Sequence, residues 1–230
     1  MHIVVDNSSR PMPTHQVAEP AILYFGTPVV LIGTTNEDGS YNLAPMSSAW
    51  WLGWRCMLGL GTKSKTTENM LRTGECVLNL PSADMVAAVD KLARTTGSNP
   101  VPANKIKRGY RYEKDKFGIA GLTPLAGETV AAPRAAECPV HLEAKVEGLH
   151  RVAQDDAMIR GHLAAIEVNI TRIHLDPRVM MEGEENRVDP DKWRPLIMSF
   201  QQFYGLAPGK LQRSELAEIP EALYRPAARV

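Results

Sequence analysis

The residues with the clearest chemical potential lie together in one stretch, residues 41–81. In its middle, hydroxyl and ammonium side chains alternate just before and within a predicted helix. They are Thr62, Lys63, Ser64, Lys65, Thr66 and Thr67. A helix N-terminus offers unpaired backbone N–H groups and partial positive charge, which suit a phosphate. The glycine spacing of a Walker-type loop is absent, and on these residues alone a capped surface helix with solvated lysines is the simpler interpretation.

Upstream, a short loop could meet the polar edge of a flat ring. It consists of Pro45, Met46, Ser47 and Ser48, and three tryptophans follow it at positions 50, 51 and 54. The loop also fits a strand end with a proline turn, and the tryptophans fit either a core or a subunit interface. Downstream, Asn79 interrupts an apolar strand, and a buried Asn must hydrogen-bond to protein or to a ligand.

The elements that hold these residues are predicted from local patterns. Strands are expected over 28–35, 41–44, Arg55–Gly61, Glu75–Leu80, 139–146 and 162–175. Ser64 is a good N-cap for a helix over Lys65–Thr73, and Gly74 suits its left-handed stop. Met70 and Leu71 are expected to face the sheet. A second helix is predicted over 83–94 and a short one over 114–120.

Alternation in the strand over 139–146 predicts one buried and one exposed face. Val140 and its alternate neighbours would be buried, while His141, Glu143 and Lys145 would face outward. Many strands, few helices and no strand–helix–strand series predict a mainly β fold, an antiparallel β-barrel with peripheral helices. The expected organisation is an N-terminal arm (1–19), a barrel domain (20–188) and a C-terminal extension (189–230) that packs on the barrel or on a partner.

Composition narrows the class of protein. The chain has 230 residues, 26 basic and 26 acidic, and 44% of its residues are hydrophobic. No long basic run suggests nucleic acid, and no apolar stretch approaches the roughly 20 residues that span a bilayer. The three cysteines are expected to be buried free thiols, and no metal site is expected. Without a signal-peptide pattern, the expected location is cytoplasmic.

Four blocks of sequence together resemble the flavin reductase-like family of FMN-binding split β-barrel proteins. They read NLAPMSS, GTKSKTTENMLRTGECVLNLPS, DKFGIAGLTP and AAPRAAECPVHLEAKV, and the resemblance covers roughly residues 21–177. It implies a split barrel, a homodimer and FMN at or near the subunit interface. It also implies hydride transfer from NADH or NADPH to FMN, with a separate monooxygenase as a further partner.

The resemblance also implies roles for individual residues. Ser47 and Ser48, in the loop with Pro45 and Met46, would meet the ring edge. The phosphate would be held by Ser64, Lys65, Thr66 and Thr67. Asn79 would bond on the ribityl–phosphate side, and Arg134 would lie by the cofactor or the partner subunit.

One departure concerns the Gly-Asp-His motif that family members with a nicotinamide donor often carry. Here the corresponding residues are Arg160, Gly161 and His162, so the acid is missing. His162 is a weak catalytic candidate near the nicotinamide, and a structural role is the simpler interpretation. NAD(P)H:flavin reductase is the leading hypothesis. The alternatives are an oxidoreductase with permanently bound FMN and its own substrate, and a non-catalytic flavin-binding protein.

Overall fold

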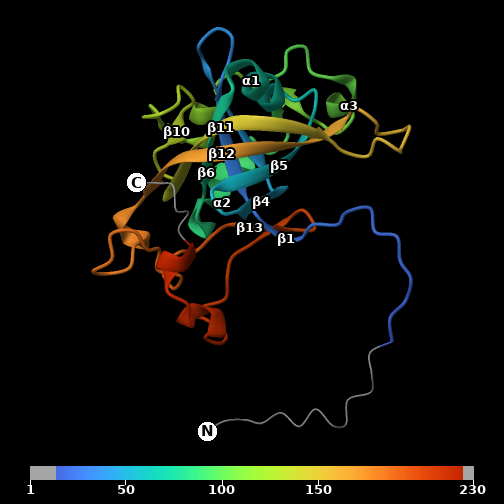
Figure 1. Cartoon of the computed structure of the whole chain (residues 1–230). Coiled ribbons are helices and arrows are strands. Elements are labelled where there is room, and N and C mark those ends of the chain that lie inside the picture. Colours follow the sequence, from blue (N-terminus) through green and yellow to red (C-terminus); the bar gives the residue numbers. More distant parts are fainter. Residues whose placement is uncertain (1–13, 225–230) are drawn as a thin grey trace.

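The computed structural model describes residues 14–224, and its centre is one seven-stranded sheet (Figure 1). The strands are β2 (Val30–Thr35), β3 (Tyr41–Met46), β4 (Ala49–Leu52), β5 (Arg55–Gly61), β6 (Glu75–Leu80), β11 (Val140–Arg151) and β12 (Leu163–Leu175). Their order is β3-β2-β6-β11-β12-β5-β4, and every pair is antiparallel. Among the described residues no ladder joins β3 to β4, so the barrel is not closed by pairing. The prediction of a mainly β, antiparallel fold is confirmed.

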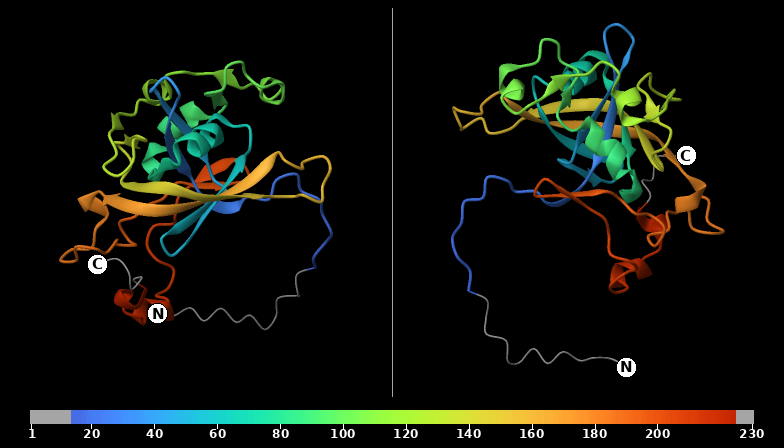
Figure 2. Two further views of the ribbon diagram at one scale, coloured as in Figure 1. Left: turned by 45° about the horizontal axis from the view of Figure 1, so that its top comes forward. Right: turned by 180° about the vertical axis from the view of Figure 1, so that it is seen from behind.

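The long strands β11 and β12 run side by side across the molecule and form a hairpin that projects at one end (Figure 2). Alternate residues of the sheet point into a first apolar core, which contains Ile32, Leu58, Leu78, Leu142, Ile166 and Val168. The opposite face of β2 and β3 packs on helices in a second core, with Leu31 and Leu43 at its centre. These two faces decide which side chains of the central stretch can share a pocket.

The helices lie outside the sheet. The α-helices are α1 (Lys65–Thr73), α2 (Val86–Leu92), α3 (Ala103–Ile106) and α4 (Lys116–Ala120). The 3-10 helices are η1 (Ala83–Met85), η2 (Pro177–Val179), η3 (Glu215–Glu218) and η4 (Glu221–Tyr224). The helix expected over 83–94 is therefore η1 continued by α2, and it ends earlier, at Leu92, because the backbone of Ala93 is extended with ψ 141°.

Helix α1 begins and ends where the sequence predicts. The Ser64 side chain accepts a hydrogen bond from the Thr67 N–H at 3.1 Å, and Gly74 takes a φ of 74° while its N–H donates to the Met70 carbonyl. Met70 is buried, as expected, but Leu71 is 50% exposed, which corrects its expected position. Consecutive helical residues are turned by about 100°, so only one of the two can face the sheet.

Short strands complete the fold. They are β1 (Phe25–Pro28), β7 (Thr95–Thr96), β8 (Arg111–Tyr112), β9 (Pro124–Leu125), β10 (Arg134–Ala135), β13 (Ile197–Ser199) and β14 (Gln202–Tyr204). The strand expected over 28–35 is interrupted at Val29, whose N–H donates to the Leu196 carbonyl. Strand β13 pairs with β1, so residues beyond 189 contact the segment that directly precedes β2. Residues 1–13 of the predicted arm lie outside the described residues, and the division into three parts stays a prediction.

The outer face of β11 is covered rather than exposed, which corrects the expected alternation. Glu143 is fully buried and accepts hydrogen bonds from the N–H groups of Glu128 and Thr129, and His141 is also buried. Only further along the strand, at Lys145, does this face reach solvent. The loop between β9 and β10 covers the first half of the strand, and local alternation cannot reveal a loop contributed from elsewhere in the chain.

Three other expectations concern thiols, metal and membrane. Cys56, Cys76 and Cys138 are all buried and free, as expected. Within residues 14–224, no cluster of three potential His, Cys, Asp or Glu ligands is arranged for a metal ion. No helix in the described part of the chain is long and apolar enough to cross a membrane.

Candidate functional site

A pocket of about 270 Å³ lies where strands β3 and β5, the start of α1 and the segment 96–116 meet. Its lining comes from four places far apart in the sequence. These residues are Ile32, Asn42, Ala44, Pro45, Met46, Gly59, Leu60, Gly61, Ser64, Lys65, Thr66, Thr96, Gly97, Lys105, Tyr110 and Lys116. One part of the pocket is apolar, and the other is rich in hydroxyl and ammonium groups.

The apolar part is formed by strands β3 and β5. Alternation on β3 directs Asn42 and Ala44 to the pocket, while Leu43 between them points into the second core. Opposite them, a Cβ atom at Gly59 would lie 2.9 Å from the Cβ of Ser48, which is too close for a side chain. Glycine at this position therefore keeps β5 close to the loop after β3 and leaves the pocket open.

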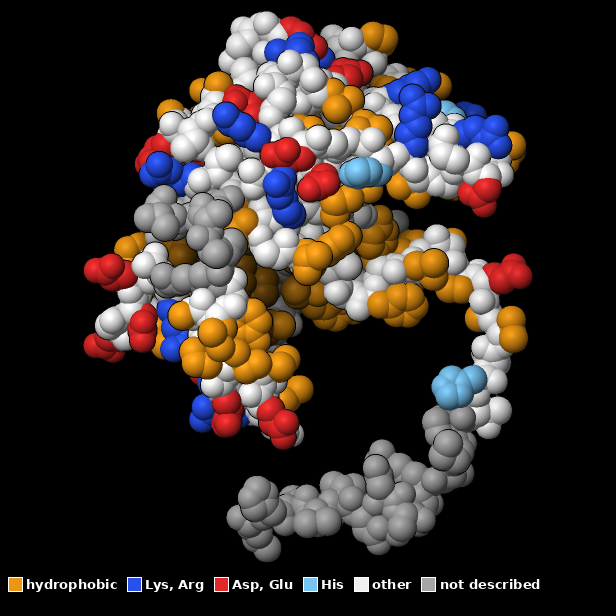
Figure 3. All heavy atoms as spheres, viewed as in Figure 1, with side chains coloured by type: hydrophobic (Ala, Val, Ile, Leu, Met, Phe, Trp, Pro, Cys, Tyr) orange, Lys and Arg blue, Asp and Glu red, His pale blue; other side chains and the backbone are white. Residues whose placement is uncertain are grey.

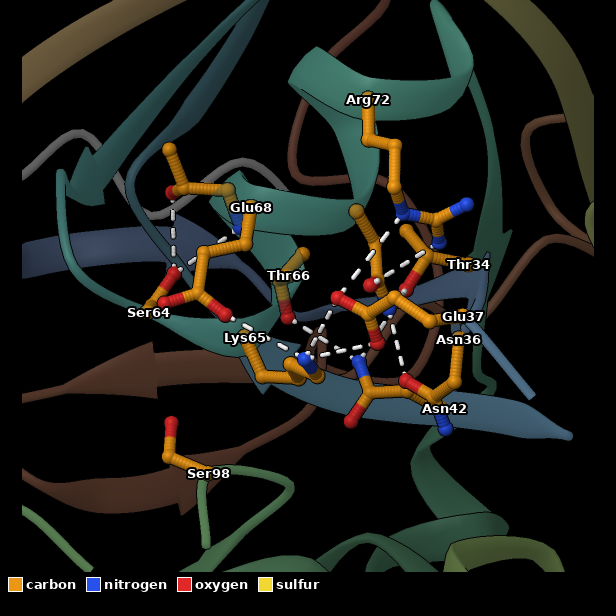
Figure 4. A network of polar contacts seen from close by, with 12 residues as sticks. Thr34, Asn36, Glu37, Asn42, Ser64, Lys65, Thr66, Glu68, Arg72 and Ser98 are labelled. Atoms are coloured by element: carbon orange, nitrogen blue, oxygen red, sulfur yellow. Dashed lines mark hydrogen bonds and ion pairs between the residues drawn. The ribbon is translucent and has the colours of Figure 1, made fainter. Parts of the chain in front are cut away.

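The polar part begins at the N-terminus of α1 (Figure 4). The Thr66 hydroxyl lines the pocket and accepts a hydrogen bond from the Asn42 amide at 3.2 Å. The same amide nitrogen donates to Thr34, so Asn42 ties the helix to the sheet. The first N–H groups of a helix have no acceptor within it. The start of α1 therefore presents backbone donors beside the Thr66 hydroxyl.

Lys65 lines the pocket with its aliphatic part, but its ammonium group points to carboxylates (Figure 4). Its Nζ lies 2.9 Å from Glu37 and 3.3 Å from Glu68. Partial burial opposes the charged form, yet the hydrogen bonds to Glu37 and Glu68 raise the pKa of Lys65 above its ordinary value. Its charge is thus already compensated within the protein.

Two other lysines of the pocket lack such a close ion pair, although the charges of Glu113 and Glu68 act on them from further away. Lys116 is only 2% exposed, and its Nζ donates to the Leu43 carbonyl at 3.3 Å. Burial, followed by the positive charge of Lys105, lowers the pKa of Lys116 to about 8. Lys105 is half-buried, and its Nζ donates to the Thr96 hydroxyl at 2.9 Å. Among the described residues, no carboxylate lies within 4.0 Å of either ammonium group.

Ser98 follows the pocket residue Gly97 in the chain but does not itself line the pocket. Its Oγ is buried and has no hydrogen-bond partner. In Figure 4 its side chain points toward the side of the network where α1 begins. Next to it, a Cβ atom at Gly97 would lie 2.8 Å from the Asn42 side chain, so glycine permits this close approach. A buried hydroxyl without a partner is uncommon, and a ligand atom or a water molecule would satisfy it.

The loop predicted to meet a ring is only partly in the pocket. Pro45 and Met46 line it, whereas Ser47 and Ser48 do not. The Ser48 hydroxyl shares a hydrogen bond with the Tyr24 hydroxyl at 2.9 Å, which links the loop to the N-terminal segment. Of the predicted phosphate ligands, Ser64, Lys65 and Thr66 line the pocket. Thr67 is fully buried behind them and donates its hydroxyl hydrogen bond to the Gly61 carbonyl.

The structure does not bring Asn79 to this pocket. Its neighbour Leu78 points into the first core, so Asn79 points to the opposite face of β6. There its amide nitrogen donates to the Leu31 carbonyl, and its oxygen accepts from the Ala135 N–H and from His141 Nδ1. All of these partners belong to the protein, so the expected place beside a phosphate is not supported.

Arg134 and His162 also lie outside the pocket. Arg134 donates to the Ala126 carbonyl at 3.0 Å and lies 3.9 Å from Glu143, on the same covered face of the sheet as Asn79. His162 is exposed, and its backbone carbonyl accepts a hydrogen bond from the Thr62 N–H. It therefore lies beside the end of β5 without lining the pocket.

Several pocket residues were missed by the sequence analysis. They are Ile32, Asn42, Ala44, Gly59, Leu60, Gly61, Thr96, Gly97, Lys105, Tyr110 and Lys116. Lys116 belongs to the block DKFGIAGLTP, and Lys105 belongs to the long cationic loop after α2. Both residues therefore lie in segments whose sequence could have pointed to the site. Asn42 is a polar residue inside a strand, which is the same kind of signal as the one considered for Asn79.

The structure combines an open antiparallel sheet with a pocket at the N-terminus of α1 that hydroxyl and ammonium side chains line in part. The sequence pattern of the flavin reductase like domain matches residues 22–204. The chain therefore belongs to this family, which places it among flavin-related oxidoreductases. It is also similar to the uncharacterized protein YdfE of Bacillus subtilis (strain 168), at 37% identity over 199 residues, or 86% of this chain and 93% of that protein.

Solved structures show the same fold. Flavoredoxin of Desulfovibrio vulgaris (Miyazaki F) has a TM-score of 0.69 at 20% identity, and the match covers 90% of this chain and 99% of flavoredoxin. An FMN-binding domain of a flavin reductases-like enzyme from Shewanella baltica OS155 has a TM-score of 0.60 at 15% identity, covering 82% of this chain and 90% of that domain. At these identities the likeness concerns the fold.

Proposed function

We propose that this protein binds FMN in the pocket between β3, β5 and α1 and catalyses hydride transfer from NAD(P)H to the flavin. Family membership and the FMN-binding relative with the same fold support a flavin ligand. The observation that carries the proposal is the buried Lys116, which has no carboxylate within 4.0 Å, together with Lys105 and the unpartnered Ser98 hydroxyl, near the start of α1.

These groups fit a phosphate monoester. Such a group carries about −1.5 to −2 charges at pH 7 and has three strong acceptor oxygens. Lys105 and Lys116 supply two positive charges, while Ser98, Thr66 and the first N–H groups of α1 supply neutral donors. A buried cation without an anion is unfavourable, so a bound phosphate would neutralise the lysine charges and would itself be neutralised by them.

The apolar part of the same pocket suits the ring of a flavin. Ala44, Pro45, Met46 and Leu60 give the pocket apolar lining, and Lys105 and Lys116 give it positive charge. FMN has this polarity, with a flat ring system at one end of a polar chain and a phosphate at the other. The distribution of side chains thus favours FMN over a small inorganic anion.

When bound, FMN supplies a ring that accepts a hydride, so no side chain has to transfer a proton in that step. The protein's own residues would bind the flavin and orient its ring. Lys105, Lys116 and Ser98 would hold the phosphate, and the strand segments from β3 and β5 would fix the ring by its edges. We name no catalytic residue, because His162 does not line the pocket.

The test measures FMN binding and NAD(P)H oxidation separately. The purified protein is titrated with FMN by calorimetry, and NADH and NADPH oxidation is then followed with and without added FMN. The proposal predicts saturable FMN binding and oxidation of one or both nicotinamides that depends on flavin. Flavin that is retained while both nicotinamides are ignored would instead support an oxidoreductase with its own substrate or a non-catalytic flavin-binding protein.

A homodimer is part of the proposal. Strand β4 is an edge of the main sheet, and its residues Trp50 and Leu52 are 57% and 73% exposed. Large apolar side chains on an exposed edge strand favour contact with another chain. Sedimentation of the purified protein measures the mass directly, and a monomer at working concentration would contradict this part. A monooxygenase partner and a cytoplasmic location remain proposals from the sequence.

A further inference from the structure

A second pocket, of about 450 Å³, lies at the other end of the main sheet. Within residues 14–224, the two pockets share no lining residue. Strand β5 spans the distance between them, because Trp54 just before its start lines the second pocket and Gly59 near its end lines the first. At about 3.3 Å per residue, the strand separates the two by roughly 15 Å. The second pocket is therefore a site of its own.

The walls of the second pocket come from β4 and the turn after it, from β6, β11 and β12, and from the segments around β1 and β13. In Figure 1, β1, β4 and β13 lie below the long strands of the sheet, whereas α1 and α3 lie above them. In Figure 3, seen from the same side, hydrophobic side chains gather over the place where Figure 1 shows these three strands. An apolar region thus surrounds the pocket.

The wall that the C-terminal part of the chain contributes is held in place by backbone hydrogen bonds. Trp193 and Ile197 belong to this wall. Between them, the Leu196 N–H donates to the Pro81 carbonyl at 3.1 Å, and the Leu196 carbonyl accepts from the Val29 N–H at 2.9 Å. The fold itself therefore shapes the pocket, as is usual for sites that bind small molecules.

Trp51 brings a polar group to this apolar lining. On β4, alternation directs Ala49 and Trp51 toward the first core, while Trp50 and Leu52 are exposed on the other side. Trp51 lines the pocket, and its indole Nε1 is buried without a hydrogen-bond partner among the described residues. An indole N–H can only donate, and a buried one usually has an acceptor. An oxygen of a ligand or of a water molecule would satisfy it.

The chemistry of the lining selects the kind of ligand. Every described residue that lines the pocket is apolar or a glycine, so a charged ligand would lose its hydration without gaining a partner. Trp51, Trp54 and Trp193 provide large aromatic surfaces, which pack favourably on another aromatic ring. The volume of about 450 Å³ lies in the range of pockets that take small organic molecules.

We propose that the second pocket binds an uncharged aromatic compound that carries an acceptor oxygen, such as an aromatic ketone. Its ring would lie against the tryptophans, and its oxygen would accept a hydrogen bond from Trp51 Nε1. A second copy of this chain suits the pocket less well, because the exposed Trp50 and Leu52 of the β4 edge point away from it. The proposal is independent of the flavin site, since neither a cation nor a helix N-terminus contributes to this lining.

The experiment uses Prodan, an uncharged naphthalene ketone whose emission shifts to the blue in apolar surroundings. Prodan is titrated into the wild-type protein, Trp51→Phe, Ile173→Gln and the matched control Leu163→Gln. Ile173 and Leu163 lie on the same strand, β12, and are 39% and 42% exposed, but only Ile173 lines the pocket. Dimethylaminonaphthalene, which has the same ring system without the ketone, is the second probe. Circular dichroism melts confirm that all four proteins are folded.

We expect the wild-type protein to bind Prodan saturably. Ile173→Gln should bind it about fivefold more weakly or worse, because apolar contact is lost, and Leu163→Gln should stay within about twofold of wild type. Trp51→Phe keeps an aromatic ring but loses the N–H. It should weaken Prodan binding about three- to tenfold more than binding of the ketone-free probe, because only Prodan offers the N–H an oxygen.

Four outcomes would overturn the proposal. They are the absence of saturable Prodan binding, unchanged affinity in Ile173→Gln, an equal loss for both probes in Trp51→Phe, and displacement of Prodan by FMN, which would put the probe in the first pocket. Prodan binding that disappears as sedimentation shows the chain forming dimers would also contradict the proposal, because a second copy would then occupy the pocket.

Discussion

The ammonium group of Lys116 donates a hydrogen bond to the backbone carbonyl of Leu43 at 3.3 Å, and among the described residues no carboxylate lies within 4.0 Å of it. Retaining a cation there lowers the stability of the free protein and is explained by an anionic ligand. Lys116→Met should therefore raise the free energy of unfolding of the free protein by roughly 1–3 kcal/mol. The same change should weaken FMN binding about tenfold or more.

Urea unfolding measures the first effect and calorimetric titration the second. The matched control is Lys145→Met, which changes the same residue type on an exposed strand face and should alter neither quantity by much. Unchanged FMN affinity in Lys116→Met would remove this lysine from the phosphate site. A loss of both stability and affinity would point to a structural role.

Lys116 also predicts a pH dependence of FMN binding. Its pKa is lowered to about 8, so the free protein holds this ammonium group charged only below that pH. FMN affinity should be highest near pH 7 and should fall as the pH rises from 8 to 9.5, and the dependence should be weaker in Lys116→Met. Over the same range the stability of the free protein should rise, because the unfolded chain then binds more protons than the folded one. Affinity that is flat between pH 7 and 9.5 would be inconsistent with the assignment.

Ser98→Ala separates ligand binding from stability. The Ser98 hydroxyl is buried without a partner, so its removal should leave the free energy of unfolding unchanged or slightly higher. If the hydroxyl donates to a phosphate, FMN affinity should fall about tenfold. Ser64→Ala is the contrasting variant, because it loses the N-cap of α1 and should cost about 1 kcal/mol of stability as well. A Ser98→Ala protein with wild-type affinity would show that this hydroxyl does not meet the ligand.

Asn79→Ala tests the opposite case, a residue that the sequence suggested for the cofactor and the structure places on the covered face. The variant removes the hydrogen bonds that the Asn79 side chain makes with the Leu31 carbonyl, the Ala135 N–H and His141. We expect roughly 2–4 kcal/mol less stability in urea, with FMN affinity within twofold of wild type at a temperature where the protein is folded. Weak FMN binding by a fully folded Asn79→Ala protein would restore its assignment to the cofactor.

The parts of the structure that could be predicted from sequence are those with local causes. Ser64 and Gly74 mark both ends of α1 because capping depends on the residue itself and its nearest neighbours. Alternate side chains of β6 face opposite sides of the sheet, and pairing with β2 and β11 decides that Leu78 faces the core and Asn79 faces outward. No local pattern in a nearly continuous apolar strand reveals that choice.

The pocket was predicted only in part for a related reason. Its helix N-terminus is local, whereas Lys105 and Lys116 reach it through a loop and a helix placed by contacts with distant strands. Likewise, His141 and Glu143 alternate like exposed residues but are covered by a loop that the strand pattern does not encode. Site residues that long-range contacts bring together can be identified only from the folded chain.

Flavin binding is tested most directly by a calorimetric titration of the purified wild-type protein with FMN. We expect saturable binding at one site per chain, with an affinity that falls as salt or pH is raised because Lys105 and Lys116 supply the charge. Absence of measurable FMN binding at neutral pH and low salt, in a protein shown to be folded, would contradict the assignment of the pocket to a flavin.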